Sequence, residues 1–203
     1  NLYAQNWSGH HTFSAGRVHL PETIEQLQEI VSRSRKVKAL GARHSFNDIA
    51  DSVEELISLD KMDQTLAIDP AARTVTVSGG ITYGRLCQEL QAAGFAIHNM
   101  ASLPHITVAG AISTATHGSG DSNGNLATAV SAIELVKANG EVVTLRRGQE
   151  DFDGAVVGLG GVGIMARVTL DIAPTFMMQQ EVYETLPMRQ VAAHFDEIMS
   201  SAY

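Results

Sequence analysis

The chain has 203 residues, of which 44% are hydrophobic and 18% charged, the composition of a folded domain with a substantial core. Its 14 basic and 22 acidic residues give a formal net charge of −8, without the basic stripe of nucleic-acid binders or a polybasic membrane patch. We therefore expect no nucleic-acid or membrane partner and favour small-molecule partners. The single cysteine, Cys87, cannot form an internal disulfide, which favours a reducing, cytoplasmic compartment.

Residues 1–62 predict a small α/β unit. The expected elements are an extended segment, a helix and two strands, at residues 17–21, 24–31, 37–40 and 55–59. Thr23 and Gln26 have the spacing of a capping box at the start of the helix. The first of the two strands stops at Gly41, so the end of that strand delivers the loop that follows. The strand and helix alternation is typical of α/β packing.

Residues 63–175 predict a second unit with antiparallel pairing. Two hairpins are expected, at residues 66–77 and 134–145, and the second turns at Asn139-Gly140. Between them, Thr82 can cap a helix that stops at Gly94, which places Cys87 on its apolar face. A last half-buried strand is expected from strict alternation, with Ala166, Val168, Leu170 and Ile172 on one face and Pro174 at its end.

Two segments about sixty residues apart are rich in Gly, Ala, Ser and Thr. They are residues 40–46, LGARHSF, and residues 103–111, LPHITVAGA, which continue to THGSG at 116–120. Small side chains leave main-chain N–H groups unobstructed, so an extended polyanionic ligand can lie directly against the backbone. One imidazole, that of His44, stands inside the first segment.

The stretch Gly158-Leu159-Gly160-Gly161-Val162-Gly163 matches GxGxxG letter for letter. A Rossmann dinucleotide site needs a strand before this motif and a helix after it. Here the glycines run directly into the strand expected from Ala166. We therefore reject a nicotinamide site and interpret the glycines as a place where the backbone passes close to something flat.

Three segments together resemble the FAD-binding domain of the vanillyl-alcohol oxidase and p-cresol methylhydroxylase superfamily: GARHSFND, NMASLPHITVAGAISTATHGSG and AVVGLGGVGIMARVTL. The resemblance spans residues 7–203 and is strongest to the alditol (xylitol) oxidases within that superfamily. It implies an α+β fold of the PCMH type, in which two α/β subdomains, residues 1–62 and 63–175, hold FAD between them. The second subdomain is expected to be largely antiparallel, and residues 176–203 to begin a truncated substrate domain.

In the first segment, the resemblance implies that His44 is attached covalently to the 8α-methyl group of the flavin. A neutral imidazole nitrogen can act as the nucleophile, and the bond would anchor the cofactor and raise its reduction potential. The alternative is a histidine that hydrogen-bonds near the pyrophosphate. Arg43 stands where many relatives have glycine, so this turn must accept a side chain. The cofactor-binding residues implied here, for which a tight strand exit is the alternative, are Ala39, Leu40, Gly41, Ala42, Arg43, His44 and Ser45.

In the second segment, the resemblance implies flavin contacts at Thr107, Gly110, Thr114, Ala115, Thr116 and His117, although His117 could instead hydrogen-bond locally. Ser102 matches a position near the reactive face of the flavin that also touches substrate hydroxyls, and as an isolated serine it is equally typical of a turn. Ile164 and Met165 would present main chain and apolar surface to the cofactor, or serve only as buried strand residues. No cysteine lies in LPHITVAG, so a single covalent link is expected.

The implied activity is oxidation of the terminal hydroxyl of a polyol, such as xylitol or sorbitol, to an aldose, with O2 reduced to H2O2. The lysine, arginine and acid that the family uses on its substrate match nothing here. We therefore expect no catalytic residue in this chain and little turnover from it alone. A sugar-lactone oxidase or dehydrogenase and a non-catalytic FAD-binding subunit that needs a partner chain stay open. The other histidines lack metal-site spacing, so no metal is expected.

Overall fold

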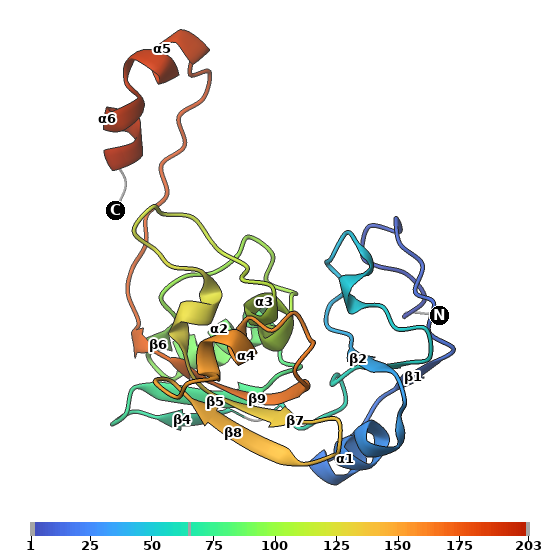
Figure 1. Ribbon diagram of the computed structural model, residues 1–203. Helices are drawn as coiled ribbons and strands as arrows, with labels where there is room; N and C mark the ends of the chain where they lie inside the picture. Colours follow the sequence, from blue (N-terminus) through green and yellow to red (C-terminus); the bar gives the residue numbers. More distant parts are fainter. Residues whose placement is uncertain (1–2, 65, 202–203) are drawn as a thin grey trace.

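Two sheets of different kinds organise the chain (Figure 1). The computed structural model describes residues 3–64 and 66–201, so the outermost residues of the predicted first and last segments, 1–2 and 202–203, lie outside it. One sheet is parallel, with strand order β1-β3-β2, and the larger one is antiparallel, with strand order β4-β5-β9-β7-β8. The predicted α+β class with a largely antiparallel second part is confirmed.

The parallel sheet consists of β1 (Arg17–His19), β2 (Val37–Ala39) and β3 (Glu55–Ile57). Parallel neighbours need a crossover, and α1 (Ile24–Arg33) supplies the one between β1 and β2. The Thr23 side chain accepts a hydrogen bond from the Gln26 N–H at 3.3 Å, as the capping pattern predicts. A short 3-10 turn, η1 (Asp48–Ala50), lies in the loop between β2 and β3.

The antiparallel sheet carries the main core. Its strands are β4 (Ala67–Asp69), β5 (Thr74–Ser78), β7 (Val130–Val136), β8 (Val142–Arg146) and β9 (Ile164–Asp171). Three helices lie over one face of this sheet, namely α2 (Tyr83–Ala92), α3 (Val108–Ser113) and α4 (Phe152–Val156) (Figure 1). Val75, Leu86, Ile112 and Val168 represent the buried cluster between these layers. Both predicted hairpins form, β4 with β5 and β7 with β8. A 3-10 turn, η2 (Leu126–Ala129), precedes β7.

A β-bulge in β9 breaks the strict alternation that the sequence predicts. Leu135 pairs with Met165 while its neighbour Glu134 pairs with Arg167, so Ala166 is the extra residue. Met165 and Val168 both join the main core cluster, whereas Ala166 packs into a second cluster. The prediction that Ala166 shares a face with Val168 is therefore wrong, because one inserted residue reverses the orientation of those before it.

Two further details concern the second half of the chain. Pro174 does not simply end a strand, because β10 (Ala173–Pro174) pairs with β6 (Phe95–Ala96). Proline is tolerated there since this two-stranded pair is an edge. Cys87 is only partly buried against the main core, and its thiol donates to Met100 Sδ at 3.3 Å.

A second buried cluster joins the two sheets. Leu27 of α1 and Ile57 of β3 pack with Val136 and Ile164 of the antiparallel sheet. Gln28 Nε2 also donates to the Gly140 carbonyl at 2.7 Å. These contacts fix α1 against the ends of β7 and β9, so the loops that leave both sheets keep a defined relation. The boundaries at residues 62 and 175 stay a prediction.

The last described residues form α5 (Met188–Ala193) and α6 (Phe195–Ser200), which stand away from both sheets at the end of a long connection (Figure 1). Their surroundings leave apolar side chains in contact with solvent, including Met177, Tyr183 and Met188. Among the residues described, no helix is both long and apolar enough to cross a bilayer.

Candidate cofactor site

A cavity of about 310 Å³ lies between the loop after β2, helix α3 and the loop before β9. This volume is within the range of small-molecule and cofactor sites, roughly 300–1,000 Å³. The structure brings most of the predicted cofactor-binding residues to its wall. Those that line it are Ala39, Leu40, Gly41, Ala42, Arg43, His44, Ser45, Thr107, Gly110, Thr114, Thr116 and Met165.

The two small-residue segments touch each other at Gly41. A Cβ atom built on Gly41 would lie 2.5 Å from Thr107 Oγ1 and 3.8 Å from the Gly110 Cα atom. Thr107 is 5% exposed, and its side chain makes no capping bond to α3, so its hydroxyl is directed toward the glycines instead. The close approach of the two segments therefore requires glycine at position 41.

The first segment offers main-chain donors to the cavity. Within residues 3–64 and 66–201, the N–H groups of Gly41, Ala42, His44 and Ser45 donate to no carbonyl or side chain of the protein. Buried or half-buried N–H groups are almost always paired, so this run favours a bound acceptor such as a phosphate.

The second segment does not present the row of free main-chain N–H groups that was expected of it. It forms helix α3, and the N–H groups of Val108, Ala109 and Ala111 donate to carbonyls of Ile81, Gly79 and Thr107. The Thr116 N–H donates to the Ala111 carbonyl. The prediction that both segments present free amides is thus wrong for much of the second, because carbonyls of residues 79 and 81 accept from the first N–H groups of the helix and the helical turn satisfies Ala111. It contributes hydroxyls and small side chains to the wall.

His44 lines the cavity and lies beside two other rings. Its imidazole stacks on Trp7, with ring centroids 4.9 Å apart and 29° between planes, and its centroid lies 4.5 Å from that of His105. The His44 Nε2 atom is shielded from solvent and has no hydrogen-bond partner among the residues described. Burial, then His105 and Arg43, lower the pKa of His44, so the imidazole is neutral at pH 7.

The comparisons with known proteins agree with this geometry. A family model described as an FAD binding domain matches residues 15–146. The chain belongs to this family of FAD-binding domains. It is 43% identical to an alditol oxidase from a Streptomyces species over 201 residues, which are 98% of this chain and 48% of that protein.

Lactone-oxidising enzymes are also similar to this FAD-binding domain. The chain is 31% identical to the L-gulonolactone oxidase of Bos taurus, over 95% of this chain and 45% of that protein. It is also 31% identical to the L-gulono-1,4-lactone dehydrogenase of Mycobacterium tuberculosis, over 86% of this chain and 42% of that protein. The chain thus spans about half the length of the curated relatives it matches.

The residues of the cavity fit FAD on two independent observations. The unpaired N–H groups after β2 suit the pyrophosphate, because consecutive main-chain donors make an anion site without a cation. The unpartnered, neutral imidazole of His44 suits a nucleophile that awaits a carbon partner.

The turn at Arg43 shows how this loop accepts a side chain at a left-handed backbone position. Arg43 has φ 65°, the left-handed conformation that glycine adopts most easily. Its carbonyl accepts from the Trp7 N–H at 2.8 Å, and its Nη1 donates to the Gln5 carbonyl at 3.2 Å. The N-terminal segment therefore holds the strained turn from both sides.

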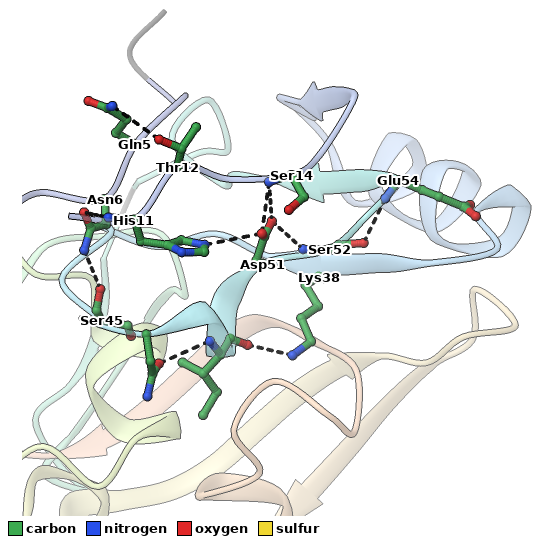
Figure 2. A network of polar contacts seen from close by, with 12 residues as sticks. Gln5, Asn6, His11, Thr12, Ser14, Lys38, Ser45, Asp51, Ser52 and Glu54 are labelled. Atoms are coloured by element: carbon green, nitrogen blue, oxygen red, sulfur yellow. Dashed lines mark hydrogen bonds and ion pairs between the residues drawn. The ribbon is translucent and has the colours of Figure 1, made fainter. Parts of the chain in front are cut away.

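The same N-terminal segment is fastened to the rest of the loop after β2 (Figure 2). Asn6 is 5% exposed, and its Nδ2 donates to the Ser45 carbonyl at 3.0 Å. Asp51 accepts from the Ser14 N–H and lies 3.3 Å from His11 Nε2. Lys38 Nζ, on β2, donates to the Ile49 carbonyl of this loop at 2.6 Å. The polar network thus joins both ends of the loop to residues 5–14.

Four predicted residues are not on the cavity wall, namely Ser102, Ala115, His117 and Ile164. Ser102 is exposed on the loop before α3. His117 is exposed and its Nδ1 lies 2.9 Å from the Gly118 carbonyl, which is the local bond given as its alternative role. Ile164 is buried in the cluster that joins the two sheets, so packing accounts for it.

The cavity also has walls that the sequence analysis did not name. Gly79 and Gly80 follow β5, and a Cβ atom on Gly80 would lie 2.7 Å from the Leu59 carbonyl oxygen. Two consecutive glycines directly after a predicted strand are the sequence feature that could have identified this part of the wall. The GxGxxG stretch also contributes Gly160 and Gly163. It follows α4 and precedes β9, the reverse of the Rossmann order, and its glycines lie along the cavity wall.

Proposed function

We propose that the protein containing this chain is an FAD-dependent oxidase that converts a polyol such as xylitol or sorbitol to an aldose by oxidising its terminal hydroxyl. The observation that carries the FAD part is the run of unpaired N–H groups facing Thr107 and Gly110 across one cavity. The polyol part is supported by the identity to an alditol oxidase, 43%, against 31% for the lactone enzymes.

In this proposal the chain binds and orients the cofactor. The N–H groups of Gly41, Ala42, His44 and Ser45 would hold the pyrophosphate, and the hydroxyls of Thr107, Thr114 and Thr116 with the Met165 side chain would border the ring system. His44 forms the single covalent link. When bound there, FAD would supply the two-electron redox chemistry that links alcohol oxidation to the reduction of O2 to H2O2.

Two finer assignments belong to the same proposal. Ser102 contacts substrate hydroxyls, supported by its exposed position one residue before the segment that leads to α3. The location is cytoplasmic, supported by the single cysteine in the sequence. In the full-length protein, Ser102→Ala should raise KM for the polyol while the covalent flavin content stays at the wild-type level. An unchanged KM would remove Ser102 from the substrate site.

The covalent link is tested by acid precipitation of the purified full-length protein. Yellow colour should stay in the washed pellet of the wild type and be lost to the supernatant for His44→Ala. His98→Ala is the matched control, because His98 is an exposed histidine outside the cavity wall. Flavin retained in the His44→Ala pellet would exclude this histidine as the attachment point, and a colourless wild-type protein would refute flavin binding.

A second function is favoured by the similarity to L-gulonolactone oxidase and L-gulono-1,4-lactone dehydrogenase. Steady-state assays on the full-length protein with xylitol and with L-gulono-1,4-lactone separate the two substrate classes. Peroxide yield under oxygen, compared with reduction of an artificial dye, separates oxidase from dehydrogenase. If substrates reduce the bound flavin only after another protein chain is added, the result would favour the third alternative, a non-catalytic FAD-binding subunit.

A further inference from the structure

Trp7, His44 and His105 form one cluster of rings, although they lie far apart in the sequence. Trp7 stacks on His44. The ring centroid of His105 lies 4.5 Å from that of His44 and 6.4 Å from that of Trp7. Trp7 is 58% exposed, so it adds little to the core. An exposed tryptophan that stacks on a half-buried histidine points to a local role at that histidine.

Hydrogen bonds from Trp7 and its neighbour Asn6 hold this segment against the residues on both sides of His44. Its own N–H donates to the Arg43 carbonyl, and the neighbouring Asn6 donates to the Ser45 carbonyl, so the indole is tied to the backbone on either side of His44. Residues 5–14 precede the part matched by the family model, which begins at residue 15. Trp7 therefore lies outside the matched residues and stacks on a histidine within them.

His44 needs such support because hydrogen bonds do not orient it. Its Nε2 atom has no partner in the described part of the chain, so neither ring plane nor tautomer is fixed in the usual way. Ring packing is the remaining constraint. A nucleophile must be held close to its attack geometry, and a displacement of about 1 Å can cost about a hundredfold in rate.

We propose that Trp7 and His105 are positioning residues that fix the His44 imidazole for covalent attachment of the flavin. The inference rests on the proposed role of His44. Trp7 covers one face of the imidazole and fixes its plane, whereas His105 packs against it from the start of the second segment. The attachment site is thereby assembled from three parts of the chain.

The attachment step is an oxidation that O2 completes. One N–H bond of His44 and one C–H bond of the 8α-methyl group break, and one N–C bond forms between them. The two protons and two electrons released pass by way of the flavin ring to O2, which leaves as H2O2. The acceptor of the proposed oxidase therefore suffices, and the His105 ring lies 4.5 Å from the ring that loses the proton, measured between centroids.

The charged or titratable groups that bear on His44 are His105 and Arg43. Burial comes first among the causes that lower the pKa of His44, and these two groups follow. Removal of His105 should raise the pKa of His44. The attachment rate rises with pH as the imidazole loses its proton. In the variant, this rise should occur at higher pH than in the wild type.

The test follows attachment in time with the full-length protein. Apoprotein from riboflavin-starved cells is mixed with FAD, and covalent flavin is measured by intact mass and by in-gel fluorescence after denaturation. Reversible FAD affinity is measured separately by flavin fluorescence. The variants are Trp7→Ala, Trp7→Phe, His105→Ala and His105→Gln, with exposed His98→Ala as control.

Trp7→Ala and His105→Ala should slow attachment by about tenfold or more, with FAD affinity within about threefold of wild type. Trp7→Phe should retain most of the rate, since a second aromatic ring can stack, and His105→Ala should shift the pH profile while His98→Ala does not. Wild-type attachment rates in both alanine variants would overturn the inference, as would a parallel loss of FAD affinity. A wild-type protein that binds FAD only reversibly would instead refute the covalent role of His44 and remove this inference with it.

Discussion

Gly41→Ala should weaken FAD binding because it separates the two segments that enclose the cavity. The new methyl group would lie 2.5 Å from Thr107 Oγ1, about 1 Å closer than carbon and oxygen atoms normally pack. Gly41 does not have a left-handed backbone, so alanine adds no strain of its own there. Thr107 is buried and β-branched, which limits its escape by rotation.

The expected cost is about 1–3 kcal/mol, typical of an extra methyl group in a packed site. If the loop moves to relieve the clash, FAD affinity should fall by about 5- to 150-fold. Isothermal titration of apoprotein with FAD measures the affinity, and urea unfolding of the apoprotein measures the free energy of unfolding. Both should change in the same direction, since the clash lies within the wall of the site.

The second mutation of a double-mutant cycle identifies the clashing atom. Thr107→Ala removes Oγ1 but keeps the Cβ atom, which would lie at an ordinary 3.8 Å from the new methyl group. Gly41→Ala/Thr107→Ala should therefore bind FAD more tightly than Gly41→Ala alone. Gly16→Ala is the matched control, because its Cβ would meet only the Glu54 carbonyl oxygen at 3.8 Å. If Gly41→Ala resembles Gly16→Ala, or if Thr107→Ala gives no rescue, the two segments do not meet as described.

Three further outcomes follow from the loop after β2 and from the core. Burial acts to raise the pKa of Asp51, but hydrogen bonds, led by the one from the Ser14 N–H, lower it below its usual value. The ionised Asp51 carboxylate therefore stabilises the folded protein above about pH 4, and this stabilisation is lost as the pH falls through the lowered pKa. Asp51→Asn should flatten that loss in urea unfolding at about pH 3 and about pH 6, and an unchanged slope would contradict it. Arg43→Val should be less stable than Arg43→Gly by about 1–2 kcal/mol in thermal unfolding, because a β-branched residue is strained at φ 65°; equal stability would show that the turn relaxes. Burial raises the pKa of the Cys87 thiol, so iodoacetamide should modify it slowly at about pH 7 and rapidly in urea, and equal rates would contradict its packing.

Features that depend on neighbours in the sequence could be predicted. The Thr23 cap, the turn at Asn139-Gly140 and the stop at Gly94 each depend on a few consecutive residues, and both glycines have the expected positive φ, 81° and 80°. The pairing of β7 with β8 follows from that turn. Local conformational preference decides such features, and tertiary contacts leave them unchanged.

Features that depend on contacts between distant parts of the chain could not be predicted from the sequence. The bulge at Ala166 arises where β9 pairs with β7, thirty residues earlier, and nothing in the alternating strand sequence marks it. The stacking of Trp7 on His44 depends on how the N-terminal segment crosses the loop, which is set by Asn6 and Asp51 (Figure 2). The small-residue pattern could identify the cavity wall, because such residues are needed wherever backbone meets backbone or ligand.

The folding of the second segment into α3 makes the two sides of the cavity act through different physics. Gly41, Ala42, His44 and Ser45 present N–H groups with no acceptor among the residues described, so their effect on a bound anion is electrostatic and depends on backbone conformation more than on side chains. Helix α3 has used the N–H groups of Val108, Ala109 and Ala111 within the protein, so its effect is one of shape, exerted by Thr107 and Gly110. This division explains why a side chain as large as Arg43 is compatible with the donor side, where only the main chain must reach the ligand, while on the facing side a Cβ atom on Gly110 would lie 2.7 Å from Thr107 Oγ1.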